Sequence, residues 1–421
     1  MFSSFFSTAP PTDPQSPNFH PISSKLKPTE LFGELQPKDT ELLCTSSGFV
    51  TETQIFYITT PDGKSIMCQL IHSSVGLWYP TIQFTCKIYD SEVQKSTWKS
   101  IHVTNFTCAP PGSDRRSCKA DEFSFTYKSK PDSDYPESYT VHANPAPEVQ
   151  IFLEVTRPVS ASGWKVGSGD EGGYSKFGPD PSNPEGYVIH RFWPLVKASG
   201  HLVINGKATP VEGQGMFVHA IQGMRPNLVA ASWNFGNFQS PDLGGVSAIQ
   251  MEFTTPTAYG MKGAGSGGVT VNIGSLVVGG KLVAVTAETR SPGDANDADA
   301  PVKSRVAHLK PVMDPDTSYH KPCELLFEWA GPSILPDKPG NYKASVNVDV
   351  GDLQHPKGLV EKVDVLAEIP KVLKMAVNYV AGTKPYIYQW MNPAKLAINE
   401  PGSDAPVEVN GYMYMESTFI S

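Results

Sequence analysis

The segment from residue 215 to residue 260 combines single hydrogen-bonding side chains with large aromatic rings. Rings and amides alternate within a few residues, as in Trp233-Asn234-Phe235 and Asn237-Phe238. Large rings exclude water from an apolar ligand, and a few amides or imidazoles orient that ligand through hydrogen bonds. The pattern is therefore typical of a pocket wall, although a barrel core whose amides fix a loop would have the same composition.

Four polar side chains of this segment could donate a hydrogen bond to a substrate oxygen on which charge develops. We predict this catalytic role for His219, Gln222, Asn234 and Asn237. A lone histidine in a strand is more often a structural group, and that alternative stays open for His219. The side chains expected to enclose the apolar ligand are Phe192, Trp193, Phe217, Met224, Trp233, Phe235, Phe238, Gln250, Glu252, Tyr259 and Tyr388.

The sequence gives little support for catalysis by a metal or cofactor, or for binding to nucleotides, nucleic acids or membranes. Zinc-protease, Walker and nucleophile-elbow motifs are absent, and the ten histidines show no ligand spacing, so we expect neither a metal nor a cofactor. The string Gly167-x-Gly169-x-x-Gly172 precedes no helix-forming run and is rejected as a nucleotide site; residues 157–186 are expected to form a flexible loop. A net charge of −8 without a basic cluster excludes nucleic acid as a partner, and no apolar run is long enough for stable membrane insertion. The expected partner is an apolar small molecule; the oligomeric state stays open.

The elements that must position these residues are β-strands. Short runs of alternating polarity are separated by turn signals such as Pro61-Asp62-Gly63 and Asn205-Gly206, which predict hairpins. The strands expected before the polar and aromatic segment are 53–59, 65–72, 81–89, 97–106, 123–128, 138–143 and 149–155. Apolar residues at helical spacing over 369–380 predict one amphipathic helix near the C-terminus. We therefore expect an all-β protein with antiparallel barrels.

The start of the chain differs from the rest. Its prolines forbid a helix, so residues 1–37 are expected to form a disordered or extended arm. The chain start lacks the pattern of a signal peptide, which favours a cytoplasmic protein with free thiols. Secretion stays open, because Cys108 and Cys118 flank a short loop and could bridge, and Asn105 begins a glycosylation sequon.

Four further segments carry a resemblance to a known family. They are Tyr187–Pro194, Val363-Asp-Val-Leu-Ala-Glu-Ile-Pro, Val380–Gln389 and the C-terminal Gly411–Ser421. With the 215–260 segment, they closely resemble the fungal cell-survival factor family. The resemblance implies two lipocalin-like antiparallel β-barrels in tandem, which we place at residues 38–195 and 196–421. It also implies one of two functions: carriage of ceramide-like lipids in stress survival, or, in a divergent branch, a hetero-Diels–Alder reaction in secondary metabolism.

Departures from the family concentrate near the expected pocket. Asn227 and Leu228 stand where the family has two histidines, and Leu195 stands where it has arginine. We therefore predict a cofactor-independent pericyclase that joins a quinone-methide polyketide to a terpene. Holding the two reactants together can contribute about 7–11 kcal/mol to such a reaction. The alternatives are a non-catalytic intracellular carrier of ceramide-like lipids, which would bind its ligand unchanged, and an interaction module without a sizeable cavity.

Overall fold

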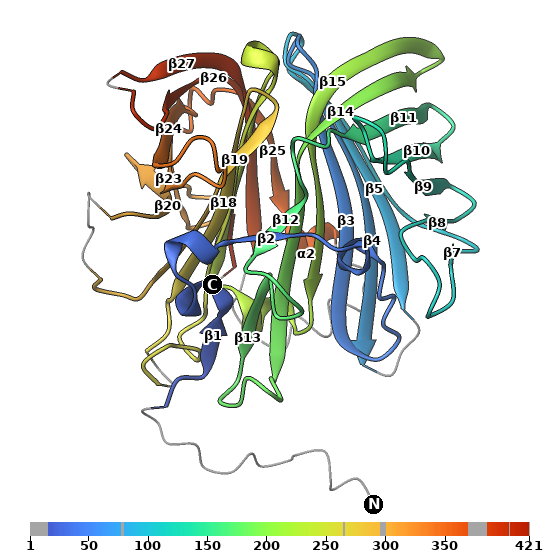
Figure 1. Cartoon of the computed structure of the whole chain (residues 1–421). Helices are drawn as coiled ribbons and strands as arrows, with labels where there is room; N and C mark the ends of the chain where they lie inside the picture. Colours follow the sequence, from blue (N-terminus) through green and yellow to red (C-terminus); the bar gives the residue numbers. More distant parts are fainter. Residues whose placement is uncertain are drawn as a thin grey trace, which may run out of the picture.

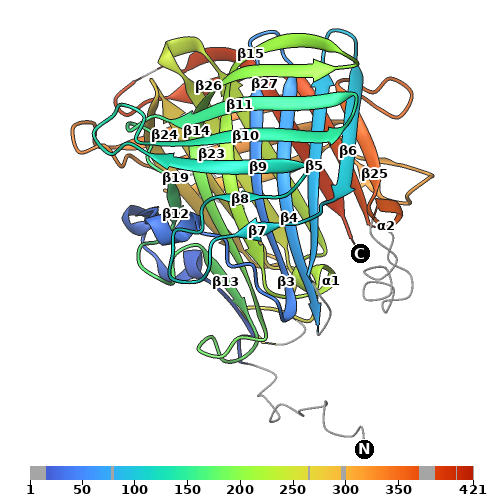
Figure 2. The same cartoon turned by 90° about the vertical axis from the view of Figure 1, so that its right-hand side faces the viewer.

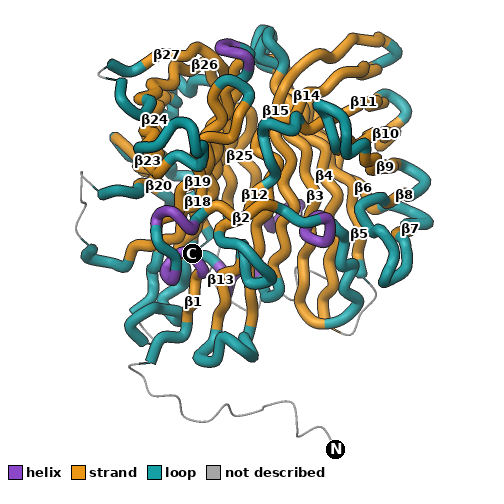
Figure 3. The backbone as a smooth tube through the Cα atoms, in the orientation of Figure 1, coloured by secondary structure: helices purple, strands orange, loops and turns teal. Residues whose placement is uncertain are grey.

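The computed structural model describes residues 16–76, 80–263, 266–294, 300–368, 385–403 and 405–420. Two antiparallel sheets stand side by side and form the two halves of the molecule (Figure 1). Strands make up most of both halves, and the helices are short (Figure 3). The predicted all-β class with two barrel-like units in tandem is confirmed.

The first sheet has 15 strands, of which eleven form its main path in the order β6-β5-β4-β3-β15-β14-β11-β10-β9-β8-β7. These strands are β3 (Gly48–Thr59), β4 (Ser65–Gly76), β5 (Thr81–Asp90), β6 (Lys95–His102), β7 (Thr107–Cys108), β8 (Cys118–Lys119), β9 (Phe123–Ser129), β10 (Glu137–Ala146), β11 (Val149–Arg157), β14 (Gly186–Ile204) and β15 (Lys207–Gln222). Strands β9–β11 run across β3–β5 (Figure 2), so the sheet folds over its own core.

The second sheet has ten strands, in the order β19-β18-β17-β16-β27-β26-β24-β23-β20, with β25 paired to β26. Their bounds are β16 (Ser232–Ser240), β17 (Val246–Thr254), β18 (Thr270–Val278), β19 (Lys281–Arg290), β20 (Lys303–Leu309), β23 (Glu324–Pro332), β24 (Asn341–Asp349), β25 (Leu359–Asp364), β26 (Tyr386–Asn399) and β27 (Val407–Phe419). A separate two-stranded sheet pairs β21 (Val312–Met313) with β22 (His320–Lys321).

Alternation along the strands explains how each sheet serves two cores. In β15, Phe217 points into the first barrel, where its ring lies 4.9 Å from that of Phe56 and 5.4 Å from that of Tyr139. Its neighbour Val218 belongs to the apolar cluster between the two sheets. Successive side chains of a strand face opposite sides, so one strand lines both spaces. The predicted turn at Asn205-Gly206 joins β14 to β15, and both residues have the positive φ that a type I′ turn requires (50° and 78°).

Residues 16–44 form a segment that we call the N-terminal strap. It comprises β1 (Phe19–Pro21), β2 (Phe32–Glu34) and the 3-10 turns η1 (Ile22–Lys25), η2 (Pro28–Glu30) and η3 (Pro37–Thr40). Strand β1 pairs with β13 (Tyr174–Phe177), and β2 pairs with β12 (Trp164–Val166). Phe19 is buried between Phe177 and Phe253. The arm expected over residues 1–37 is therefore docked from residue 16 onward, because its few apolar side chains find partners in both halves.

Two further expectations differ from the structure. The expected domain boundary between residues 195 and 196 falls inside β14, whereas the two sheets divide between Gln222 and Ser232. The reason is that β14 and β15 complete the first sheet by pairing with β11 and β3. The loop expected over 157–186 contains β12 and β13. The helix predicted over 369–380 lies outside the described residues.

The remaining helices are short turns. They are α1 (Pro226–Val229), η4 (Asp242–Gly244) and α2 (Val365–Glu368). Within the described ranges, no helix combines the length and the hydropathy needed to cross a membrane.

Candidate ligand-binding site

A cavity of about 520 Å³ lies between the two sheets. Its first wall is the outer face of the first sheet, where alternate residues of β3 (Thr51, Thr53, Ile55 and Tyr57) point away from the barrel core. The cross-strand register continues this face on both sides of Ile55, through Val218 and Phe192 in one direction and through Gln69 and Thr85 in the other. The wall is thus apolar at one end and carries amide and hydroxyl groups at the other.

The second wall comes from the other half of the molecule. Met251, Phe235, Glu416 and Gln389 are cross-strand neighbours on β17, β16, β27 and β26. A second row contains Phe253, Trp233, Ile387 and Val363, and both rows line the cavity. The walls touch where the Tyr57 ring lies 5.1 Å from the Phe235 ring. Aromatic and aliphatic side chains therefore face each other across the space.

A buried cation joins the two halves at the edge of the cavity. Lys87 of β5 donates to the carboxylate of Glu361 and to the amide oxygen of Gln389, each over 2.5 Å. Its ammonium group also lies 4.5 Å from the centre of the Trp98 ring. Gln389 in turn donates to Glu416 over 2.8 Å. Lys87 is only 6% exposed, so the pairing meets the need of a desolvated charge for partners.

His190 is a buried histidine that faces the cavity without a partner. It is 8% exposed, its ring stacks on Phe192 at 6.2 Å, and its side chain forms no hydrogen bond with any residue that the structure describes. Burial lowers its pKa to about 4, so the imidazole is neutral near pH 7. A neutral imidazole offers one donor and one acceptor. His190 is therefore a ready hydrogen-bonding group in the wall of the cavity.

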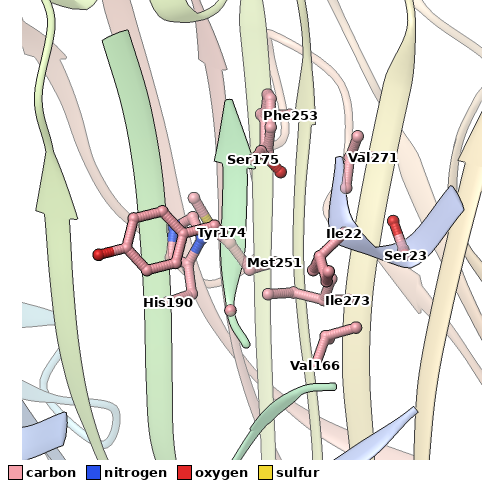
Figure 4. A pocket seen from close by; sticks show the side chains of 11 residues that line it. Ile22, Ser23, Val166, Tyr174, Ser175, His190, Met251, Phe253, Val271 and Ile273 are labelled. Carbon is pink, nitrogen blue, oxygen red and sulfur yellow. The ribbon is translucent and has the colours of Figure 1, made fainter. Parts of the chain in front are cut away.

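A second, smaller pocket lies beside His190 (Figure 4). Its volume is about 10 Å³, roughly the space for one water molecule. Ile22 and Ser23 of the strap line it together with Met251 and Phe253, which also line the large cavity. The strap therefore closes the space next to His190.

The expected site residues separate into two groups. The residues that line the cavity are Gln222, Phe192, Met224, Trp233 and Phe235. The residues that lie elsewhere are His219, Asn234, Asn237, Trp193, Phe217, Phe238, Gln250, Glu252, Tyr259 and Tyr388. Strand alternation is the reason for most of the second group. Trp193 and Phe217 pack in the first barrel, and Phe238 and Tyr388 pack in the second.

His219 belongs to a buried charge network rather than to the cavity. Its Nδ1 lies 2.9 Å from the carbonyl oxygen of Asp39, and its Nε2 lies 2.8 Å from the carboxylate of Glu52. Both ring nitrogens therefore lie against oxygen atoms of the protein. Burial raises the pKa of Glu52, but the hydrogen bond from His219 and those from two strap amides outweigh it, so the pKa is lowered overall. Lys165 and Arg191 also bind Asp39, so the network fastens the strap to the first sheet.

Glu252 and Asn234 lie inside the second barrel. Glu252 accepts hydrogen bonds from Asn234, Asn272 and Arg290, so its cation is Arg290. Arg225 lies outside this group and stacks on Phe49. Burial raises the pKa of Glu252, and these bonds only partly offset that effect. Gln250 is bound to the Glu328 carbonyl in the same interior.

Three other expected residues hold structural contacts outside the cavity. Asn237 accepts a hydrogen bond from Gln239. Tyr259 donates to Glu185, and Tyr388 donates to Asp314. These side chains therefore already have protein partners.

Sequence reasoning missed His190 and, apart from Gln222, the polar residues of the first wall. The signal was present in the strand predicted over 53–59, where Thr53, Ile55 and Tyr57 share one face and Gln54 and Phe56 share the other. Which face meets a ligand depends on the second sheet, and no local pattern reveals that.

Comparisons with known proteins now give the family. The model of the Svf1 family matches residues 2–421. The chain belongs to this family. A ceramide-binding protein of Schizosaccharomyces pombe is 32% identical over 95% of this chain and 93% of its own length. A ceramide-binding protein of Yarrowia lipolytica is 32% identical over 96% of this chain and 94% of its own length.

Solved structures show the fold. The crystal structure of CghA has a TM-score of 0.57 and 12% identity, and covers 89% of each chain. The structure of CghA with Sch210972 has a TM-score of 0.56 and 13% identity, again over 89% of each chain. At this identity the likeness concerns the architecture alone.

The expectation of a pericyclase is corrected by these relatives. Svf1-family proteins that are 30–33% identical to this chain carry the name of ceramide-binding proteins, which is a binding role and not an enzymatic one. The geometry agrees with the correction, because His219, Asn234 and Asn237, three of the four residues expected to act on a substrate, have structural positions. Among the described residues, no group of three or more His, Cys, Asp or Glu side chains could hold a metal ion.

Proposed function

We propose that the protein is a non-catalytic carrier of ceramide-like lipids and that it binds them in the cavity between its two sheets. The observation that carries this proposal is the 520 Å³ cavity itself, because its size is within the range of small-molecule sites and its walls are mostly apolar. The family adds support, since relatives that span nearly the whole chain are named for ceramide binding. The cytoplasmic location expected from the sequence remains a prediction.

The distribution of polar groups suits such a lipid. Its hydrocarbon chains would lie between Val218, Ile55 and Phe192 on one wall and Trp233 and Phe235 on the other, where burial of apolar surface contributes about 25 cal/mol per Å². A ceramide head group also carries an amide and hydroxyls, which need hydrogen-bond partners once they leave water.

The polar groups of the first wall include two candidates for contact with the head group. His190 offers its unpaired ring, and Gln69, Thr85 and Gln83 lie on the far side of Ile55 and Ile71. We assign His190 to the head group, because its ring is buried and lacks a partner among the described residues. The amide and hydroxyl groups of β4 and β5 lie nearer the open edge of the sheet.

Two substitutions in one strand test the location. Ala220 faces the cavity, whereas Ala208 of the same strand is exposed. We expect Ala220→Trp to fill the cavity and to lower binding of a fluorescent ceramide at least tenfold without a change in melting temperature. Ala208→Trp, the matched control, should bind like the wild type. Equal binding by both variants would exclude the cavity as the site.

The nature of the ligand is tested on the protein from a fungal host. Native mass spectrometry and organic extraction should recover a long-chain amide lipid in stoichiometric amount. A chemically altered terpenoid or polyketide in its place, or a protein that neither carries nor binds a ceramide, would overturn the proposal.

A further inference from the structure

Three cysteines that are distant in the sequence meet at one end of the first barrel. Cys108 and Cys118 are cross-strand partners in β7 and β8. Cys44, at the end of the strap, brings its thiol within hydrogen-bonding reach of the Cys108 sulfur. All three are free thiols. The strap and the β7–β8 hairpin are further joined by the Leu42 amide, which donates to the Arg115 carbonyl over 3.1 Å.

Cys108 has the surroundings of a reactive thiol. It is half-buried, its Sγ donates to the Arg115 carbonyl oxygen over 3.7 Å, and the Arg115 side chain lies beside it. The Nε atom of Arg115 is buried and has no acceptor within the part of the chain that the structure describes. A thiolate at Cys108 would supply that acceptor. The hydrogen bond from Cys44 and the contact with Arg115 outweigh the opposing effect of burial and lower the pKa of Cys108 to about 6.

The other two thiols stay protonated. The hydrogen bond to Cys108, followed by burial, raises the pKa of Cys44. Cys118 is 5% exposed, and burial raises its pKa as well. The cluster thus contains one partly accessible nucleophile, one adjacent protonated thiol and one thiol withdrawn into the core. This is the arrangement of an attacking and a resolving cysteine.

We propose that Cys108 and Cys44 form a dithiol site that reacts with hydrogen peroxide or an organic hydroperoxide. The Cys108 thiolate attacks the peroxide, the O–O bond breaks, and Cys108 becomes a sulfenic acid while an alcohol or water leaves after taking a proton. The Cys44 sulfur then attacks the Cys108 sulfur. A disulfide forms, the S–O bond breaks, and the hydroxide leaves as water with the proton of Cys44. Two thiols are oxidised and one peroxide is reduced.

The disulfide would join the strap covalently to the β7–β8 hairpin. Cys44 directly follows Leu43, and the amides of both residues donate to Glu52 of the buried charge network. Oxidation of Cys44 would therefore add a covalent link at the same end of the strap that is already bound to Glu52 by hydrogen bonds.

The first experiment measures thiol reactivity in the full chain. The reduced protein is treated with iodoacetamide at pH 7, and peptides are quantified over time. We expect Cys108 to react at least tenfold faster than Cys323, a half-buried cysteine of the second half, because an ordinary thiol is only a few per cent thiolate at this pH. In Arg115→Met the pH midpoint of the Cys108 reaction should rise. Equal rates for Cys108 and Cys323, or an unchanged midpoint, would overturn the proposal.

The second experiment identifies the resolving residue. After hydrogen peroxide treatment, peptide mapping should find a Cys44–Cys108 disulfide. In Cys44→Ser, dimedone should trap a sulfenic acid on Cys108. A Cys108–Cys118 disulfide in either protein would show that Cys44 is not the partner, and absence of any oxidation at Cys108 would overturn the site. Melting temperatures of the reduced variants confirm that they are folded, and neither experiment depends on the lipid.

Discussion

The interior of the first barrel and the space between the sheets share the same strands but are packed differently. On one face of β15, Phe217 belongs to a ring cluster that also contains Phe56, Tyr139 and Trp193. On the other face, Val218 and its neighbours border a cavity of about 520 Å³. The barrel interior is filled by aromatic side chains. In this chain the hollow space lies between the two units.

The polar groups of the two regions differ as well. On the inner side of the first barrel, the His219 ring faces two oxygen atoms. The Glu52 carboxylate lies within hydrogen-bonding distance of three nitrogen atoms. In the cavity, His190 has no partner among the described residues. Satisfied buried groups hold a fold together, whereas an unsatisfied one facing a cavity is available to a ligand. Burial alone therefore does not tell a structural histidine from a binding one.

The largest loss of stability is expected when the buried charge network around Glu52 is broken. Glu52→Leu leaves the buried His219 and two strap amides without their acceptor, so the free energy of unfolding should fall by about 3–5 kcal/mol. Urea unfolding measures it, and Glu408→Leu, at an exposed position, is the control. A loss below 1 kcal/mol would show that the network does not stabilise the strap. Lipid affinity of the folded fraction should stay within twofold.

A pair of aromatic truncations separates the two faces. Phe217→Ala should lower the free energy of unfolding by about 3–5 kcal/mol, because it opens a void in a packed core. Trp233→Ala, on the cavity wall, should cost much less stability and weaken lipid binding. The two properties are measured by urea unfolding and by titration with a fluorescent ceramide. A larger loss of affinity for Phe217→Ala than for Trp233→Ala would reverse the assignment of the faces.

The pH dependence of stability reports on His190. Its pKa of about 4 in the folded protein lies below the ordinary value of 6.5, so the unfolded chain binds more protons between these values. The free energy of unfolding should therefore rise with pH from about 4 to 6.5. Replacing His190 with Phe should reduce this slope by up to about 1.4 kcal/mol per pH unit. His308, whose pKa burial also lowers to about 4, would keep part of the slope. An unchanged slope would mean that His190 is not buried in solution.

The smallest change in stability is expected when an exposed ion pair is removed. Lys395 and Glu408 are 3.0 Å apart and more than half exposed. Lys395→Met should change the free energy of unfolding by less than about 1 kcal/mol, because solvent screens the pair. Urea unfolding of this variant beside Glu52→Leu tests whether burial determines the contribution of a charge pair in this protein. A loss equal to that of Glu52→Leu would refute that account.

The sequence predicted local structure well and long-range placement poorly. The Asn205-Gly206 turn follows from the φ angles that these residues tolerate, and the strands around it follow from alternating polarity. The identity of the cavity wall does not follow in this way. It requires β15 to pair with β3 from the start of the chain, and it requires β16 to face them from the second sheet. Trp233 therefore lines the cavity, whereas Asn234, its neighbour, points into the second barrel.

The N-terminal strap has a consequence for synthesis on the ribosome. Asn18 donates to the carbonyl oxygen of Ala258, which is 240 residues further along, and Ser23 bonds to Thr289. At roughly 5–20 residues per second, the strap emerges tens of seconds before these partners are made. A segment that is made well before its partners is thus among the last to dock. Its prolines and its low content of apolar side chains suit a segment that must wait in water without aggregating.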